Sequence, residues 1–220
     1  MLLSRHVIRN LGAHPTTWKK LKATVLFNIG FTNLWWRKPF LTEEDYHASM
    51  SVIRPGDLVL VGNHRKFVAL IMRGIVTHSL LYVGEGECIH ANADGVEQCS
   101  YRELFDFYDT LIVVRINTSD EHRQRAISWT RDKLGLPYDY NFDPTSHREW
   151  FCTKLICGAY EEAHAKLSPC VHKRVVFPRE LVSSIGTRIF HSQSLCEQEN
   201  DVVLNQTMYK NPLLRKLLTS

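Results

Sequence analysis

A short apolar hairpin limits the folds open to this chain more than any other feature of its sequence. The segments HSLLYVG (78–84) and CIHANA (88–93) each have the length and the β-branched or aromatic content of a strand. The three residues between them, EGE (85–87), suit a tight turn, so the two segments should pair as an antiparallel hairpin. An antiparallel sheet is therefore the expected centre of the fold.

More strands and several helices are expected on either side of this hairpin. Two apolar runs have strand character, and other segments show helical spacing or helix-capping residues. The expected strands are 58–62 and 110–116, and the expected helices are 65–75, 100–107, 118–134, one that begins near 150, and 177–185. A small, mostly antiparallel sheet packed on helices predicts an α+β fold.

Two of these helix starts depend on capping boxes, in which Ser or Thr stands three residues before Glu. They are Ser100 with Glu103, and Thr118 with Glu121.

The chain divides into three expected parts. Its 220 residues suit one domain with additions at the ends. We expect an N-terminal helical extension (1–50), the α+β domain (51–190) and a polar C-terminal tail (191–220).

Two histidines stand inside the apolar hairpin. Alternation along each strand, with the turn at 85–87, makes His78 and His90 diagonal neighbours if their faces coincide. A buried histidine needs a hydrogen-bond partner, and each ring would supply one for the other. The alternative is a pair of half-exposed strand histidines, and the spacing supports both interpretations equally.

The stretch WFCTKLICGAY (150–160) places two cysteines at the start of an amphipathic helix. Cys152 falls in the first turn, where free backbone N–H groups and the helix dipole favour a thiolate and offer an oxyanion hole. Cys157 lies more than a turn further on, which indicates packing. A buried, inert Cys152 is the alternative, and histidines elsewhere in the chain that could act as its base weaken it.

Three further residues are candidates for a substrate cleft. His64 follows the first predicted strand, and antiparallel pairing of that strand with the hairpin would bring it near His78. An exposed loop histidine is the favoured alternative. Tyr138 and Asp139 precede the loop that leads to the cysteine helix, where they either line the cleft or serve as turn residues.

Six irregularly spaced cysteines without a CxxC pair indicate reduced thiols in a reducing compartment. A zinc site made of Cys88, His90 and Cys99 has no recognisable ligand spacing. Neither a metal nor a cofactor is therefore expected.

The chain is mildly basic, with a formal net charge of +4. No basic run interleaved with aromatics points to nucleic acid, whereas an anionic polymer or a membrane surface would suit this charge. The apolar segment ATVLFNIGFTNLWW (23–36) lies between cationic residues and is too short to span a bilayer. We favour a helix packed on the domain, and the alternative is a contact with the membrane surface.

The order of these motifs resembles a known family. PGDLVLV (55–61) followed by THSLLYVGEGECIHANADG (77–95) is similar to the core of the NlpC-type cysteine hydrolases, which share the papain-like fold. In the ordinary family the nucleophilic cysteine precedes this block, whereas here it follows. With LGLPYDYNFDP (134–144) and FPREL (177–181), that order resembles the circularly permuted YiiX/YebB-like branch over about residues 50–190.

This resemblance implies a permuted papain-like fold and a Cys–His(–His) hydrolase that needs no cofactor. Cys152 matches the nucleophile, His78 the general base, and His90 the polar residue that orients the base. Many permuted members have Glu at the third position, so this chain departs from the pattern there. Tyr138 falls where the family has a tyrosine near the site.

The resemblance leaves more than one substrate class open. The family is known for cleaving amide bonds in peptidoglycan peptides, and a mildly basic domain suits an anionic wall polymer. We expect this amidase or endopeptidase activity. The alternative is a lipid acyl hydrolase or acyltransferase of the lecithin:retinol acyltransferase-like type, whose typical NCEHF motif is absent here. A non-catalytic binding module is a third class, against which the complete Cys–His–His set argues.

The expected location follows from the same resemblance. Such enzymes also occur as antibacterial effectors exported without a cleavable signal, and an immunity protein would then be a partner. The stretch MLLSRHVIRNLGAHP (1–15) lacks the apolar core and cleavage site of a signal peptide. We therefore expect synthesis in the cytoplasm and signal-independent export to the periplasm.

Overall fold

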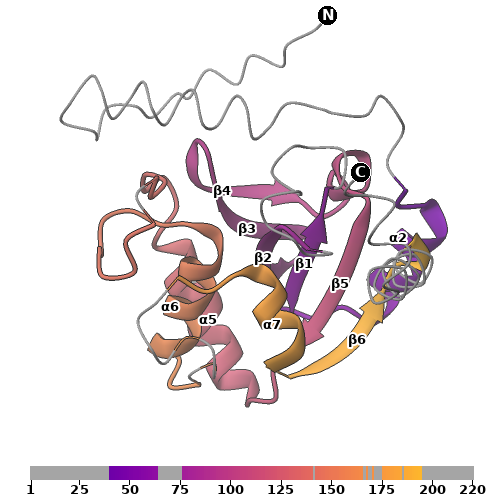
Figure 1. Cartoon of the computed structure of the whole chain (residues 1–220). Coiled ribbons are helices and arrows are strands. Elements are labelled where there is room, and N and C mark those ends of the chain that lie inside the picture. Colours follow the sequence, from indigo (N-terminus) through magenta and orange to yellow (C-terminus); the bar gives the residue numbers. More distant parts are fainter. Residues whose placement is uncertain are drawn as a thin grey trace, which may run out of the picture.

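A single antiparallel sheet forms the centre of the protein (Figure 1). The computed structural model describes residues 40–63, 76–140, 142–165, 167, 170, 175–184 and 186–194. Within these ranges, six strands lie in the order β4-β3-β2-β1-β5-β6. They are β1 (Leu58–Gly62), β2 (His78–Gly84), β3 (Glu87–Asn92), β4 (Gly95–Ser100), β5 (Thr110–Arg115) and β6 (Thr187–His191). The predicted hairpin of β2 and β3 and the predicted α+β class are both confirmed.

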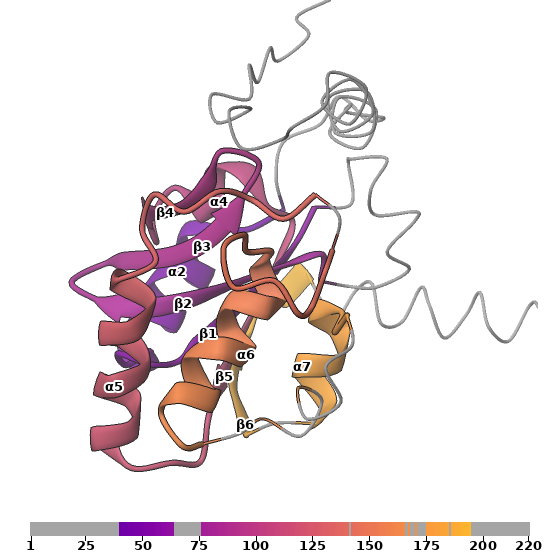
Figure 2. The same cartoon turned by 90° about the vertical axis from the view of Figure 1, so that its left-hand side faces the viewer.

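Helices cover both faces of this sheet. The five described helices are α2 (Glu43–Val52), α4 (Leu104–Phe107), α5 (Asp120–Arg131), α6 (Cys152–Glu162) and α7 (Pro178–Ser184). Figure 2 shows α5, α6 and α7 in front of one face, where α6 contacts β2 and β3. Helices α2 and α4 pack on the other face.

Some predictions concern residues outside these ranges. Those for 1–39, including the apolar segment 23–36, and for the helix 65–75 cannot be compared with the structure. Helix α2 runs from Glu43 to Val52 and so crosses residue 50, where we expected the extension to end. Within the described part of the chain, no helix has the length and apolar character needed to cross a bilayer.

The central strand β1 is buried on both faces, which explains its unbroken apolar run. Leu58 and Leu60 belong to the core between the sheet and the α5–α6 side. Val59 and Val61 belong to a second core on the α2–α4 side. All four are fully buried, and burial of each such side chain stabilises the fold by about 1.5–3 kcal/mol. Alternation along one strand therefore connects two cores.

The PGD turn before β1 has a structural explanation. Asp57 is fully buried and accepts two hydrogen bonds from Arg115, of 2.9 and 2.7 Å, in a bidentate arrangement. The same carboxylate accepts from the Arg54 amide at 2.7 Å. At Gly56, which has a φ of +90°, a Cβ would lie 2.8 Å from Arg123. The turn thus needs glycine for space and aspartate for charge.

The capping box predicted at Ser100 and Glu103 is wrong. Ser100 is the last residue of β4, a strand we did not predict, and it pairs with Glu87. Glu103 is helical and provides no side-chain cap, so α4 begins only at Leu104. The segment GVEQCS was difficult to assign because its outer residues are polar and it begins with glycine.

The second capping box is wrong by one residue. Ser119, and not Thr118, caps α5 by accepting a hydrogen bond from the His122 amide. The Thr118 hydroxyl instead bonds with the His122 ring at 2.9 Å. The helix itself is confirmed, although it ends at Arg131 and not at Leu134.

The chain adds a sixth strand near its C-terminal end that the sequence did not reveal. Strand β6 pairs with β5, and the residues after it also pack on the sheet. Ser192 and Ser194 are buried, and their hydroxyls bond with the Leu111 amide (3.1 Å) and the Asp109 carbonyl (2.7 Å). Residues 192–194, which we assigned to the tail, therefore contact the domain.

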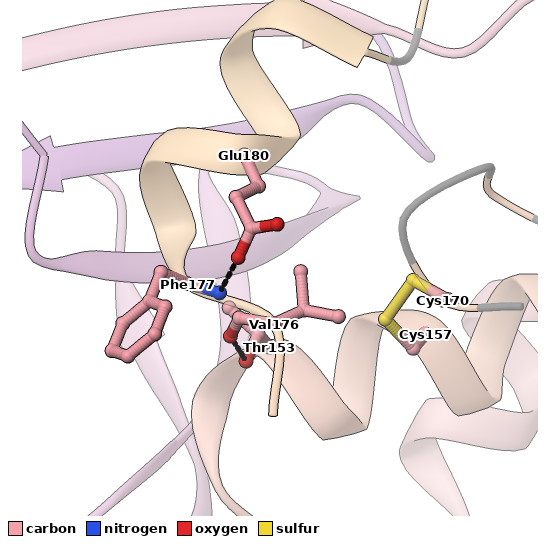
Figure 3. The surroundings of a disulfide bond; sticks show 6 residues. All are labelled: Thr153, Cys157, Cys170, Val176, Phe177 and Glu180. Carbon is pink, nitrogen blue, oxygen red and sulfur yellow. Dashed lines mark hydrogen bonds between the residues drawn. A yellow bond between two sulfur atoms is a disulfide. The ribbon is translucent and has the colours of Figure 1, made fainter. Parts of the chain in front are cut away.

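The expectation of reduced thiols throughout is also wrong. Cys157 and Cys170 form a disulfide, with Cα atoms 5.6 Å apart (Figure 3). It joins the middle of α6 to the chain that leads to α7. One turn earlier on α6, the Thr153 hydroxyl donates to the Val176 carbonyl at 2.6 Å. Two separate bonds therefore hold the segment before α7 against the same helix.

We expect the variant Cys157→Ser/Cys170→Ser to unfold at a lower denaturant concentration than the oxidised protein. The bond closes a loop with a sequence separation of 13 residues, and a loop of that size stabilises by about 3 kcal/mol. Urea unfolding followed by fluorescence measures the difference. Reductant should weaken the wild type and leave the variant unchanged. An equal response of both proteins to reductant would contradict the bond.

Candidate active site

Cys152 is the first residue of α6, as predicted. The preceding Phe151 is extended, with φ −110° and ψ 163°, and its side chain makes no capping hydrogen bond. The first-turn amides of Cys152 and Thr153 instead act on the Cys152 sulfur. The predicted apolar face, which is buried in the core, fixes the helix; it comprises Leu155, Ile156, Ala159, Tyr160 and Ala163.

Burial and hydrogen bonding act on the Cys152 thiol in opposite directions. Only 8% of the residue is exposed, and this burial raises the pKa of the thiol. The side chain and backbone of Ser79, with the first-turn amides, lower the pKa by a smaller amount. The expectation of a lowered pKa is therefore wrong for the free protein, because desolvation of the charged sulfur outweighs its donors.

Ser79 is the side chain that lowers the pKa of the Cys152 thiol most. It is fully buried, and its hydroxyl makes no hydrogen bond of ordinary geometry with the described residues. The same hydroxyl nevertheless lowers the pKa of Cys152. We take both observations to mean that the hydroxyl lies beside the sulfur without being aligned to it. A neutral thiol is a weak acceptor, whereas a thiolate is a strong one.

The two histidines of the hairpin are in direct contact. His78 Nε2 lies 2.7 Å from His90 Nδ1, which confirms the predicted diagonal contact. The rings are nearly edge to face, with centroids 5.0 Å apart and planes at 69°. His90 is 7% exposed and His78 is half-buried. On its other side, His90 Nε2 lies 3.4 Å from a carboxylate oxygen of Glu97.

Strand β2 directs its first two side chains to opposite faces of the sheet. Ser79 pairs with Leu60, which faces the α6 side. His78 pairs with Val61, which faces the α2–α4 side. The histidine and the serine therefore leave the strand in opposite directions, at its N-terminal end.

Tyr108 lies beside His78 and also experiences the charge of the Cys152 thiolate. Its ring is stacked on that of His78, with centroids 6.4 Å apart and planes at 9°. Burial raises the pKa of Tyr108 most, and the thiols Cys99 and Cys152 raise it further. Tyr108 thus keeps its proton at neutral pH.

Tyr138, which we predicted to be near the site, is buried, and the Cys152 thiol contributes to its electrostatic surroundings. Burial raises the pKa of Tyr138, and Cys152 is the next largest cause. Its ring contacts those of Tyr140 and Phe142, with centroids 5.0 and 6.3 Å away. An aromatic cluster therefore precedes the helix that carries the cysteine.

Asp139 has a different role from the one expected. It is fully buried, and the Lys154 ammonium donates to its carboxylate at 3.1 Å. Lys154 also donates to the carbonyls of Asp143 (2.6 Å) and Glu149 (2.8 Å), which uses all three of its N–H groups. We therefore assign Asp139 to the support of the loop before α6 and not to substrate binding.

The two other predictions for this site concern His64 and a metal. His64 lies outside the described residues. Among the residues that are described, no group of three or more His, Cys, Asp or Glu side chains is arranged to hold a metal ion.

Three residues of the site were missed in the sequence. Ser79 could have been noticed as the polar residue inside an apolar strand next to a candidate base. Glu97 could be placed only after β4 was recognised, because it pairs with His90 across β3 and β4. No sequence signal distinguished Tyr108, which reaches the site through the tertiary fold.

Comparison with known proteins identifies one sequence family. Residues 52–218 match the family of permuted papain-like amidase enzymes, YaeF/YiiX, known as C92. No curated protein matched the chain. Among solved structures, the chain is similar to the metalloprotein yiiX from Escherichia coli O157:H7, with 17% identity and a TM-score of 0.40. That similarity covers 50% of this chain and 66% of the other, so this chain spans slightly less than two thirds of that protein.

We expect Ser79→Ala to raise the pKa of Cys152 still further. Removing a donor destabilises the thiolate, so more alkaline pH is needed to form it. The midpoint of thiolate formation therefore moves to a more alkaline pH in this variant. The pH dependence of iodoacetamide alkylation at Cys152 measures this midpoint.

Ser49→Ala is the matched control for this experiment. Ser49 is also fully buried, but its hydroxyl donates to the Tyr46 carbonyl at 3.0 Å on the α2 side of the sheet. The control should leave the midpoint unchanged. Identical midpoints for Ser79→Ala and the wild type would show that the serine does not act on the sulfur.

We expect Lys154→Met to destabilise the fold by about 3–5 kcal/mol, because it leaves the buried Asp139 carboxylate without its cation. Urea unfolding measures the loss. The double variant with Asp139→Asn should recover part of it, since no charge is then buried alone. Lys133→Met, which removes only a cation–π contact with Trp129, should cost about 1 kcal/mol or less. Equal losses in Lys154→Met and Lys133→Met would contradict this account.

Proposed function

Because this chain belongs to the C92 family of permuted papain-like amidases, we propose that it hydrolyses amide bonds with Cys152 as nucleophile and His78 as general base. One observation carries the proposal. Ser79, which donates to the Cys152 sulfur at the start of α6, is the next residue after His78 in β2, and His78 contacts His90 of β3 at 2.7 Å. The site thus contains a nucleophile, a base and a group that orients the base.

The proposed reaction begins with transfer of the Cys152 thiol proton to His78, through one water molecule, around the N-terminal end of β2, where the two side chains lie on opposite faces of the sheet. Nε2 of His78 is engaged with His90, so Nδ1 is the nitrogen that takes the proton. The thiolate then attacks the carbonyl carbon of the substrate. The Cys152 amide donates to the oxyanion, and the protonated His78 returns its proton to the leaving amine. Water hydrolyses the resulting thioester by the reverse proton movements.

Ser79 has a defined part in this scheme. Burial makes the thiolate costly, and the serine hydroxyl is a donor that becomes effective once the sulfur is charged. A high pKa in the free protein is compatible with catalysis, because proton transfer to His78 occurs as the thiolate forms.

We propose that the substrate amide lies in peptidoglycan peptides and that the enzyme acts in the periplasm. The net charge of +4 suits an anionic wall polymer. The disulfide between Cys157 and Cys170 supports an oxidising compartment, since such bonds are rare where thiols are kept reduced. An antibacterial effector with an immunity protein as its partner is the biological role we favour.

A lipid acyl hydrolase is the second candidate, and one observation favours it. Phe142 and Phe177 are 42% and 38% exposed, respectively. Both flank the start of α6: Phe142 packs 5.4 Å from Phe151, and Phe177 follows Val176, which accepts a hydrogen bond from the first turn. Exposed aromatic rings beside a nucleophile offer an apolar surface for an acyl chain.

The two candidates separate in a single experiment. Purified peptidoglycan and anionic phospholipid vesicles are incubated in parallel with the wild type, Cys152→Ala and Cys99→Ala. We expect new amine termini in the peptidoglycan fragments by mass spectrometry, lost by at least about a thousandfold in Cys152→Ala. Cys99→Ala removes a free thiol outside the proposed mechanism and should retain activity.

Release of fatty acid with intact peptidoglycan would replace the first candidate by the second. Activity of Cys152→Ala equal to that of the wild type on either substrate would reject the nucleophile.

A further inference from the structure

We infer that Glu97 is a positioning residue that fixes the protons on the two histidines, so that His78 presents an unprotonated Nδ1. The placement of the protons follows from contacts between β2, β3 and β4. Only the use that His78 makes of Nδ1 rests on the proposed function.

The contact between the histidines requires one donor and one acceptor. A neutral imidazole carries one N–H, so the 2.7 Å contact between His78 Nε2 and His90 Nδ1 has two arrangements. In the first arrangement His78 donates from Nε2, and its Nδ1 carries no proton. In the second, His90 donates from Nδ1, and His78 is protonated on Nδ1. Only the first arrangement leaves His78 able to take a proton at Nδ1.

Glu97 distinguishes between these arrangements. It stands opposite His90 in the pairing of β3 with β4, and its Oε1 lies 3.4 Å from His90 Nε2. His90 is 7% exposed, and its Nε2 makes no hydrogen bond of ordinary geometry among the described residues. A carboxylate can only accept, so the stable arrangement places the His90 proton on Nε2, facing Glu97.

The rest of the proton arrangement follows from this choice. With the proton on Nε2, His90 has a bare Nδ1, which accepts from Nε2–H of His78. Nδ1 of His78 then carries no proton. The opposite arrangement would place two acceptors, the buried His90 Nε2 and the partly exposed Glu97 carboxylate, against each other, which is unfavourable for the buried nitrogen.

Neighbouring groups hold Glu97 in place and add no competing charge. The Asn92 side-chain amide donates to Oε1 of Glu97. Burial raises the pKa of Cys99, the next thiol along β4, to about 12. Tyr108, stacked on His78, also keeps its proton at neutral pH. Glu97 is therefore the anion that the histidine pair faces from β4.

The proton balance during the reaction is simple. When the thiol proton reaches Nδ1 of His78, that ring becomes an imidazolium and donates from Nε2 to His90. His90 keeps its proton on Nε2, which faces the Glu97 carboxylate 3.4 Å away. No proton passes to the carboxylate, and its charge stabilises the cation through one intervening ring.

Long-range proton–nitrogen NMR of the full chain, labelled with ¹⁵N-histidine, tests this arrangement directly. We expect the wild type to show Nε2–H and bare Nδ1 in both His78 and His90. Glu97→Ala should show a mixture that includes Nδ1–H. Glu97→Gln should keep the wild-type pattern, because its amide oxygen still accepts. Glu87→Ala is the matched control, because it removes a carboxylate from the first residue of β3, away from the contact between His90 and Glu97.

Kinetics with the same variants give a second measurement. Loss of the carboxylate that faces His90 Nε2 should lower kcat by about 10- to 100-fold in Glu97→Ala and leave KM within about twofold. Urea unfolding should show that the Glu97 variants remain folded.

An Nδ1–H on either ring of the wild type, or identical spectra for the wild type and Glu97→Ala, would overturn the inference. A wild type with this proton arrangement and no hydrolase activity would reject the proposed function alone.

Discussion

The two-residue period of strand β2 determines how the site is built. His78 and Ser79 are adjacent, and the pleat sends one to the α2–α4 face and the other toward α6. The base is thereby tied to the hairpin through His90, whereas the sulfur is tied to a different residue of the same strand. One end of β2 thus holds both the base and the donor to the sulfur. A shift of the strand register by one residue would move each of these side chains to the other face of the sheet.

Burial is the second constraint on this site. Cys152 is nearly enclosed, which opposes formation of its charge, so stabilisation must come from fixed donors and not from water. The first-turn amides and Ser79 provide these donors from two elements that the core holds together. The same enclosure strengthens each of these interactions, because the local dielectric constant is low. Activation of the thiol thus depends on packing as much as on the residues that touch it.

Much of this arrangement could be predicted from the sequence, for local reasons. The histidine contact follows from a short turn and strict alternation, and the position of Cys152 follows from the start of an amphipathic helix. Strand β4 and its Glu97 were missed because a half-polar edge segment has weak strand character. The Cys157–Cys170 disulfide forms because the segment after α6 folds back against that helix. The spacing of the cysteines in the sequence does not predict this return. Asp139 was a candidate for a cleft or for a turn, because a lone aspartate after a tyrosine gives no sign of a lysine 15 residues later.

The anchoring of Lys154 has a consequence for how such an enzyme can diversify. Two of its three acceptors are backbone carbonyls, of Asp143 and Glu149, and these exist whatever side chains occupy the loop. Only Asp139 contributes a side chain to the anchor. Substitutions elsewhere in the loop therefore leave this lysine anchor in place, and of the loop's exposed rings Phe142 also contacts Phe151, the residue before α6. The side chains of this loop can therefore change, and with them the substrates that the loop contacts, while the nucleophile stays in place at the start of α6.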